Sequence, residues 1–330
     1  RQFVRSAGVG ALAATGVARG GAALAAEEEA EAQPGAGGSG AASDYDAIVL
    51  GAGFAGVTAA RELRTSGLRV LLLEARPRLG GRTFTSEVAG HQFELGASYV
   101  HWTQPYIWTE ITRYGLEIDE PALTAPPRSA WVTGGELREG SFDDLTLKGF
   151  RAAGAFFYDA MQVLPRPHDP LFVPEIAKLD PSSVTDRLEG LGLPQDQRDI
   201  LDAIFATSGH CDPSEAGLVE MLRWYTLPGA TLTSYMDSVG RYWLRGGMKT
   251  LIQGILDDGR PELRLSTPVK SVQQRDGQVI VTTDAGETVS ARAVVVTAPL
   301  NVLSQIEFSP PLSPEKMAAA REGHAGSGVK

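Results

Sequence analysis

The stretch DYDAIVLGAGFAGVTAARELRTSGLRVLLLEAR, residues 44–76, decides the fold of this 330-residue chain. Its apolar run at 48–50 is typical of a buried parallel strand, and a second run at 70–73 is of the same kind. Residues 55–64, which lie between the two runs, are rich in helix formers. The stretch therefore predicts a strand, a helix and a second parallel strand, which is the repeating unit of an α/β fold.

Three glycines, Gly51, Gly53 and Gly56, lie before this helix at G-x-G-x-x-G spacing. The first allows a tight turn, the second lets the backbone approach a pyrophosphate, and the third lets the helix pack on the strand. Glu74 ends the second strand, where a carboxylate can accept hydrogen bonds from both ribose hydroxyls. A tight turn or a solvated acid would explain each feature alone. Together they predict dinucleotide binding.

A second glycine cluster follows at once, in the segment RPRLGGRT at 76–83. A nicotinamide-binding domain does not need it, whereas an FAD-binding domain does. Gly80 and Gly81 let the main chain run close to a bulky ligand, and Arg82 can neutralise the charge of a pyrophosphate. The alternative for Arg82 is an ordinary surface arginine. The two clusters together favour FAD as the cofactor.

The composition excludes several classes of function. Thirty basic and forty acidic side chains give a formal net charge of -10 and are interspersed, so nucleic acid is not an expected partner. The single cysteine, Cys211, cannot form an internal disulfide or a multi-thiolate zinc site. We find no metal-ligand spacing among the histidines and acids, so no metal is proposed, and no G-x-S-x-G elbow for hydrolysis. The length allows about two domains.

The two ends of the chain differ from its middle. Residues 1–26 combine basic Arg1 and Arg5 with a weakly apolar stretch and an A-x-A site, as in an export signal of the twin-arginine type. A surface helix or a tail is the alternative. Residues 27–43 are acidic and then rich in Gly, Ala and Ser, which predicts a flexible linker. We expect an exported protein, with a cytoplasmic one as the alternative, no membrane-spanning helix, and a chain clipped at both ends.

Further motifs extend the pattern along the chain. The segment EARPRLGGR at 74–82 is followed by FELGA at 93–97, RGGM at 245–248, Pro268-Val269 and APL at 298–300. With the glycine fingerprint, these motifs make the chain resemble the flavin amine oxidase family, which includes monoamine oxidases, polyamine oxidases and L-amino acid oxidases. The resemblance runs from about residue 44 to the end of the sequence.

Two segments are similar to one branch of that family. YVHW at 99–102 and LPRPHDPLF at 164–172 look most like the bacterial nicotine oxidoreductases and the related pseudooxynicotine amine oxidases. Tyr99 departs from the tryptophan that is usual in the nicotine branch, which leaves the size of the pocket open.

The resemblance implies an α/β fold with an FAD-binding, Rossmann-like domain of the GR2 type and a discontinuous α+β substrate-binding domain. The FAD domain would comprise 44–117 and 245–308, and the mostly helical substrate domain 118–244. A second substrate-domain segment would start at 309–330, with the C-terminal part of the fold missing from these residues. The patterns agree, because β-branched runs separated by Gly-containing turns fill 263–297 and helical spacing fills 180–202.

The resemblance also assigns residues to the cofactor. Val269 would contact the adenine through its backbone, and 96–98 would lie beside the flavin ring. The full cofactor set is Gly51, Gly53, Phe54, Ala55, Gly56, Glu74, Ala75, Arg76, Gly80, Gly81, Arg82, Gly96, Ala97, Ser98, Val269 and Pro299.

The candidates for the substrate pocket are Tyr99, His101, Trp102 and Trp108, because aromatic faces attract cations and pack flat rings. Tyr225 and Tyr242 could join them. Lys330 is the catalytic candidate, because it matches the lysine that holds a water against flavin N5 in the family; an exposed terminal lysine is the alternative. We do not expect His101 to be a general base, since hydride loss beside an amine nitrogen needs little proton chemistry.

These observations predict an enzyme, a flavin-dependent amine oxidoreductase. A hydride would pass from the α-carbon of an amine to flavin N5, water would hydrolyse the resulting imine, and electrons would go to oxygen or a carrier protein. A nicotine-like amine is the favoured substrate. An L-amino acid or polyamine oxidase and an inactive flavin-binding fragment are the alternatives. Covalent flavin attachment and oligomeric state are not readable, and a homodimer stays open.

Overall fold

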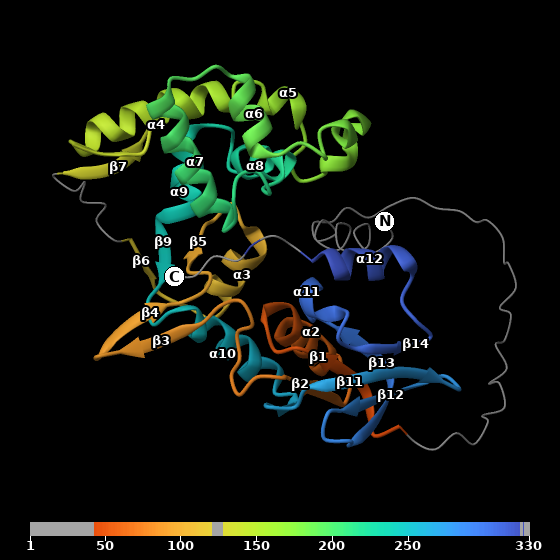
Figure 1. Ribbon diagram of the computed structural model, residues 1–330. Helices are drawn as coiled ribbons and strands as arrows, with labels where there is room; N and C mark the ends of the chain where they lie inside the picture. Colours follow the sequence, from red (N-terminus) through yellow and green to blue (C-terminus); the bar gives the residue numbers. More distant parts are fainter. Residues whose placement is uncertain (1–42, 121–127, 324–325, 327–330) are drawn as a thin grey trace, which may run out of the picture. The chain divides into compact units, whose positions relative to one another are not determined.

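A computed structural model describes residues 43–120, 128–323 and 326 of the chain (Figure 1). The predicted export signal at 1–26, nearly all of the predicted linker and the catalytic candidate Lys330 lie outside the described residues. These three assignments stay predictions.

The βαβ unit forms as the sequence predicts. β1 (Tyr45–Leu50) leads through α2 (Phe54–Thr65) to β2 (Val70–Leu73), and the two strands pair in parallel with Leu50 opposite Leu73. All four residues of β2 are buried, as is typical of a strand covered on both faces. Burying one such leucine contributes about 1.5–3 kcal/mol.

Among the described residues, this unit lies in a seven-stranded sheet with the order β10-β2-β1-β13-β12-β11-β14. β1 pairs in parallel with β13, whereas β11, β12 and β13 form an antiparallel meander. Its turns fall at 276–277 and 284–286, where the Asp-Gly and Asp-Ala-Gly signals predict them. The added strands are β10 (Glu262–Arg264), β11 (Val269–Arg275), β12 (Gln278–Thr283), β13 (Thr288–Val296) and β14 (Glu307–Ser309).

α10 (Met248–Gly259) packs against α2 beside this sheet. The two helices approach closely at Gly259, where a Cβ atom would lie 2.6 Å from the Cα of Arg61. α10 starts at Met248, the last residue of the RGGM motif, and its N-cap Gly247 has a φ of 81°, a value that glycine adopts without strain. The motif therefore sets the point at which the chain turns into this helix.

A small sheet marks the places where the chain leaves and re-enters this region. β6 (Ile118–Asp119) leads out and β9 (Tyr242–Leu244) leads back, and both pair within the order β5-β9-β6. β5 (Tyr99–Val100) completes it and is followed by α3 (Pro105–Arg113). Two hairpins, β3–β4 (Thr85–Val88, His91–Glu94) and β7–β8 (Ser129–Thr133, Glu136–Gly140), complete the strands of the described residues.

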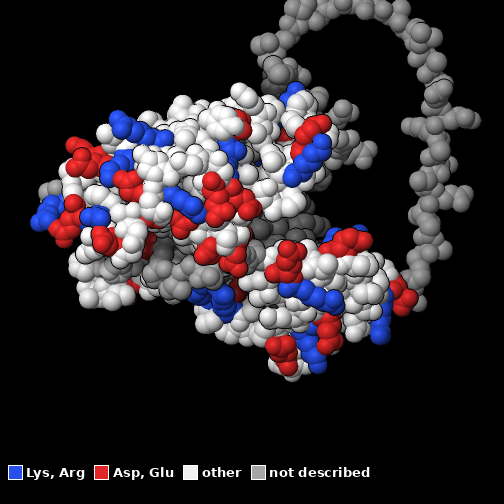
Figure 2. Space-filling model, turned by 45° about the horizontal axis from the view of Figure 1, so that its top comes forward, with Lys and Arg blue, Asp and Glu red and all other residues white. Residues whose placement is uncertain are grey.

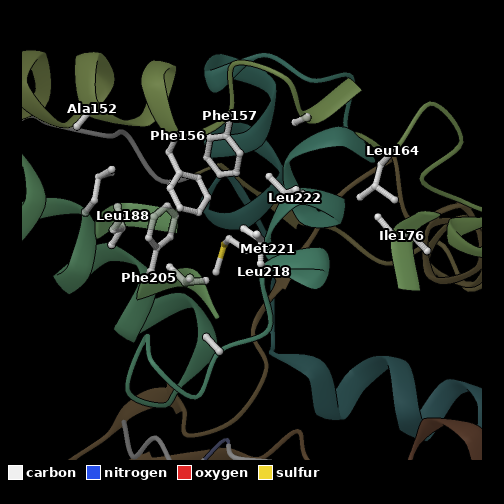
Figure 3. Packing of buried hydrophobic residues seen from close by; sticks show 14 residues of the cluster. Ala152, Phe156, Phe157, Leu164, Ile176, Leu188, Phe205, Leu218, Met221 and Leu222 are labelled. Carbon is white, nitrogen blue, oxygen red and sulfur yellow. The ribbon is translucent and has the colours of Figure 1, made fainter. Parts of the chain in front are cut away.

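Residues between β8 and β9 are helical and have a hydrophobic core of their own (Figure 3). Phe156 and Phe205 face each other across it with ring centroids 4.5 Å apart, and Leu222 is completely buried beside them. The helical spacing read from 180–202 corresponds to α6 and α7. The helices are α4 (Phe142–Phe156), α5 (Ala160–Val163), α6 (Val184–Gly190), α7 (Gln195–Gly209), α8 (Leu218–Thr226) and α9 (Leu232–Gly240), with short 3₁₀ turns at Pro170–Phe172 and Pro174–Lys178.

After β13 come the short α11 (Leu300–Leu303), β14 and α12 (Pro314–Glu322). On the face presented in Figure 2, acidic and basic side chains are intermixed and separated by uncharged areas, in keeping with the interspersed charges of the sequence. Among the described residues, no helix combines the length and apolar character that a membrane span requires.

Candidate functional site

The candidate site lies at the carboxyl ends of the parallel strands β1, β2 and β13. Gly51 directly follows β1, Glu74 directly follows β2, and Thr297 directly follows β13. Leu50 is paired with both Leu73 and Val296, so the three following residues share one edge of the sheet. In open α/β sheets, ligands bind at this edge.

The first and third glycines of the fingerprint are required by the packing at this edge. Gly51 has a φ of 102°, and a Cβ on Gly56 would lie 1.7 Å from the carbonyl oxygen of Gly51. The Thr297 hydroxyl donates a 2.7 Å hydrogen bond to the Leu50 carbonyl and lies against both glycines. Thr297 was missed by the sequence reasoning, since only its place after an apolar strand could have pointed to it.

The second glycine borders the N-terminus of α2. Gly53 is the N-cap residue and carries no side chain to accept the free amide hydrogens of the first helical turn, which includes Phe54 and Ala55. A Cβ on Gly53 would lie 3.7 Å from the Cα of Gly81, and the Gly80 amide donates to the Ala52 carbonyl at 2.9 Å. The two glycine clusters therefore lie against each other, beside a helix end that attracts anions.

Glu74 is buried and holds the turn together. One of its carboxylate oxygens accepts a 2.6 Å hydrogen bond from the Ala52 amide, and the other accepts a 2.9 Å bond from the Arg76 amide. Each oxygen of an ionised carboxylate can accept a further hydrogen bond. The carboxylate is thus oriented by the backbone, while its predicted contact with ribose hydroxyls stays a prediction.

Arginines gather at the second glycine cluster. Arg78 donates to the carbonyls of Gly81 and Thr83 at 3.1 and 3.0 Å, and its guanidinium lies 4.2 Å from the centre of the Phe84 ring. Burial, and then the neighbouring charge of Arg76, lower the pKa of Arg78. Arg82 is exposed. The sequence analysis selected Arg76 and Arg82 but missed Arg78. Only its position three residues before Gly81 could have pointed to its contact with that carbonyl.

The segment predicted to lie beside the flavin ring is joined to these arginines. The Ala97 amide donates to the Arg82 carbonyl at 3.1 Å, and a Cβ on Gly96 would lie 2.2 Å from the same oxygen. On the other side, a Glu94 carboxylate oxygen accepts the amide hydrogen of Met248, the first residue of α10, at 3.1 Å. Residues 96–98, with Ser98 buried, are therefore fixed between the second glycine cluster and α10.

The last two cofactor candidates reach the same sheet edge through their neighbours. The Thr267 amide donates to the Glu74 carbonyl at 2.8 Å, which brings the start of β11 and Val269 beside the end of β2. Pro299 is the N-cap residue of α11, two residues after Thr297. The structure thus brings the predicted cofactor residues to one region.

A flavin dinucleotide fits this arrangement of groups. Its diphosphate would meet the amide hydrogens of α2 and the guanidiniums of Arg76 and Arg82. Gly53 and Gly81 leave space that a side chain would fill. A diphosphate needs donors and positive charge, and a ribose needs an acceptor such as Glu74.

The pocket candidates form a cluster of rings around β5 and β9. Tyr99 lies opposite Trp243 in the small sheet, with nearly parallel rings 6.3 Å apart. Trp108 meets Tyr242 edge to face at 5.9 Å. Trp243 was missed because only strand pairing brings it beside Tyr99. Tyr225 does not join this cluster, since it stacks on Phe157 at 4.1 Å in the helical core.

His101 has a different position from the other pocket candidates. Its ring is only 1% exposed, Nδ1 lies 2.8 Å from the Thr103 hydroxyl, and Nε2 lies 3.1 Å from a carboxylate oxygen of Asp237. Both ring nitrogens are therefore bonded to protein atoms, so in this structure neither is available to a substrate. Within the described residues, no three His, Cys, Asp or Glu side chains gather as a metal site would require.

Comparison with known proteins decides the family. Residues 54–330 match the family model for flavin containing amine oxidoreductases. The chain belongs to this family. The flavin amine oxidoreductases are flavin-dependent enzymes, so the resemblance read from the motifs is confirmed at this level.

Two bacterial dehydrogenases named after nicotine compounds are similar to the chain. It is 40% identical over 333 residues to a pseudooxynicotine dehydrogenase of a Pseudomonas species, covering all of this chain and 67% of that protein. It is 41% identical over 288 residues to a nicotine dehydrogenase of Pseudomonas putida, covering 87% of this chain and 60% of that protein. The chain thus spans 60 to 67% of the length of these relatives.

Solved structures of flavin amine oxidoreductases share the fold. Cyclohexylamine oxidase from Brevibacterium oxydans superimposes with a TM-score of 0.70 at 24% identity, covering 84% of this chain and 63% of its own. A putrescine oxidase gives a TM-score of 0.68 at 23% identity, covering 82% and 62%. The predicted fold class is confirmed, including the expectation that these residues span only part of it.

Proposed function

We propose that this chain forms the FAD-binding and substrate-lining part of an enzyme that dehydrogenates a nicotine-like amine. The observation that supports it best is the continuity of the site: the Ala97–Arg82 hydrogen bond joins the glycine-rich dinucleotide region to the segment that leads into the aromatic cluster. A cofactor held by the first region would therefore have its reactive ring near the second.

The residues have separate tasks in this proposal. The amides of α2 and the arginines hold the diphosphate, and Glu74 accepts the ribose hydroxyls. The backbone at Gly96 and Ala97 would lie along the flavin ring. The bound flavin supplies a hydride acceptor for the carbon next to the amine nitrogen.

The aromatic cluster would select the amine. Tyr99 and Trp243 present two nearly parallel, partly exposed rings, and Trp102, which follows soon after Tyr99 in the sequence, is exposed. Such faces pack against a flat heterocycle and attract a cationic nitrogen. The names of the relatives support a nicotine-like compound, which carries both groups.

The test is anaerobic reduction of the bound flavin in protein made from the complete gene. We expect nicotine or pseudooxynicotine to bleach the flavin absorbance at least ~100-fold faster than simple monoamines, polyamines or amino acids. Mixing the reduced protein with oxygen or with a carrier protein then identifies the electron acceptor. Bleaching by amino acids or polyamines alone would contradict the proposed substrate class, and a bound flavin that no amine reduces would contradict the proposed activity.

Glu74→Gln is expected to weaken cofactor binding. The amide side chain offers one acceptor oxygen where the carboxylate offers two, so the amide hydrogen of either Ala52 or Arg76 faces an NH2 group. One unsatisfied buried donor costs about 1–3 kcal/mol. Flavin content after dialysis and the denaturation midpoint measure the two consequences.

The matched control is Glu87→Gln, which removes an exposed acid from β3. We expect it to change neither quantity. Wild-type flavin content in the Glu74→Gln protein would contradict the ribose-binding assignment.

A further inference from the structure

One buried polar pair joins the aromatic cluster to the helical region. His101 directly follows β5, and Asp237 lies in α9, 136 residues later in the chain. The His101 ring is almost fully buried, whereas Asp237 is partly exposed. The pair therefore links the end of β5 to a helix far along the chain.

The backbone determines which nitrogen of His101 carries the proton. The Thr103 amide can only donate, and it points at Nδ1 at 3.2 Å, so Nδ1 must be an acceptor without a hydrogen. A neutral ring with a bare Nδ1 carries its hydrogen on Nε2, which then donates to Asp237. The Thr103 hydroxyl, 2.8 Å away, is a second donor to Nδ1.

The charged groups around the pair keep Asp237 ionised. Arg241 donates to its other carboxylate oxygen at 2.9 Å and also pairs with Glu120 at 3.1 Å. Burial raises the pKa of Asp237, but the hydrogen bonds from Arg241 and His101 outweigh burial, and the pKa is lowered. The Tyr242 ring also lies near the His101 ring, with ring centroids 5.6 Å apart.

His101 makes ring contacts with two members of the aromatic cluster. Its ring centre lies 4.8 Å from the Trp102 ring and 5.6 Å from the Tyr242 ring, and Tyr242 in turn meets Trp108. A rotation of His101 about its side-chain bonds would therefore displace the rings on both sides. The bond to Asp237 opposes this rotation.

We propose that Asp237 is a positioning residue, which acts through His101. By accepting the Nε2 hydrogen, it fixes the orientation of His101 and so places the rings of Trp102 and Tyr242 for the substrate amine. It also leaves His101 without a nitrogen for proton transfer, so the amine does not pass its proton to His101 and is expected to bind neutral or to lose its proton to water. This inference rests on the proposed function, and it names a determinant of substrate binding that neither the motifs nor the comparisons identify.

The experiment compares three variants in full-length holoenzyme from the complete gene. Asp237→Leu removes the acceptor, and Asp237→Asn keeps an acceptor oxygen for Nε2. Glu120→Gln is the matched control, because it removes the charge of the other partner of Arg241 and leaves the His101 bond intact. Stopped-flow reduction by the best amine of the panel separates the dissociation constant of the amine from the limiting rate of reduction.

We expect Asp237→Leu to raise the dissociation constant about 10-fold or more while the limiting rate changes less than about 3-fold. Asp237→Asn should recover most of the affinity, and Glu120→Gln should match the wild type. In ¹⁵N-histidine spectra, the wild type and Asp237→Asn should give a fixed Nε2–H tautomer for His101, and Asp237→Leu a mixture. This spectrum needs no turnover, so failure of the proposed function would not hide the result.

Two outcomes would overturn the inference. One is equal behaviour of Asp237→Leu and Glu120→Gln, which would reduce Asp237 to a structural partner of Arg241. The other concerns the pH dependence of flavin reduction. For amines of different pKa, the midpoint of the pH profile of the reduction rate should follow the pKa of each amine. A single inflection shared by all amines, and lost in His101→Gln, would make His101 a base and contradict its fixed tautomer.

Discussion

Gly56→Ala is expected to prevent both stable folding and flavin binding. The added Cβ would lie 1.7 Å from the carbonyl oxygen of Gly51 and 2.9 Å from the Thr297 hydroxyl. The first contact is with backbone, so it is relieved only if α2 moves away from β1. Overpacking of a core costs about 1–3 kcal/mol when side chains can adjust, and we expect at least the upper end here because they cannot.

Substitutions at two other glycines distinguish an effect on folding from an effect on cofactor binding. Gly154→Ala lies inside α4 with no atom within 4 Å of the new Cβ, so it should stabilise the protein by up to about 1 kcal/mol. Gly53→Ala adds a Cβ in ordinary contact, 3.7 Å from Gly81, and its φ of -79° suits alanine. We therefore expect Gly53→Ala to fold normally and to bind flavin poorly.

The measurements are the thermal midpoint of each variant with and without added FAD, and the flavin absorbance after gel filtration. The wild type and Gly154→Ala should gain stability with FAD, because a ligand that binds only the folded state raises the midpoint. Gly53→Ala should not. A Gly56→Ala protein with the wild-type midpoint would show that α2 does not pack on β1 as described.

The local part of this site could be predicted from the sequence, and the fold explains why. Strand, glycines, helix and acid are neighbours within residues 44–76, and each has a backbone reason for its place, so spacing alone located β1, α2 and β2. The second glycine cluster was recognisable for the same reason. Both clusters then proved to be in contact, at Gly53 and Gly81.

Long-range contacts could not be predicted in this way. Thr297 reaches Gly51 only because β13 pairs with β1, and Trp243 reaches Tyr99 only because β9 pairs with β5. His101 illustrates the same limit: as part of the YVHW segment it resembles a pocket residue, but its partner Asp237 lies far along the chain. Spacing identifies groups that share a turn, whereas pairing of distant strands decides which side chains meet.

Arg61 is a further case, and it leads to the second large prediction. In the sequence it is followed by Glu62 and Arg64 in the same helix and no motif marks it, yet its side chain is only 3% exposed. It donates to both carboxylate oxygens of Glu110 in α3 and to the Tyr114 hydroxyl, with Asp258 of α10 4.0 Å away. One guanidinium therefore joins three helices.

Arg61→Met is expected to destabilise the protein by about 3–5 kcal/mol, because it leaves the Glu110 carboxylate, 15% exposed, without its main partner. The control is Arg113→Met, which removes a 47% exposed arginine 3.6 Å from the same carboxylate and should cost at most about 1 kcal/mol. Adding Glu110→Leu to Arg61→Met should recover much of the loss, since replacing a buried ion pair with apolar groups is often neutral. Urea denaturation midpoints of the four proteins measure these differences.

The pH dependence gives the same prediction an independent test. Hydrogen bonds from Arg61 are the largest cause that holds the pKa of Glu110 below its usual range. A carboxyl whose pKa is lower in the folded state stabilises the fold fully above its unfolded pKa of about 4.3, and this contribution is lost as the pH falls through the folded value. The stability difference between wild type and Arg61→Met should therefore be largest at neutral pH and shrink below about pH 4. A difference that stays constant down to pH 3 would mean that Arg61 acts through packing of its aliphatic stem instead of through the charge of Glu110.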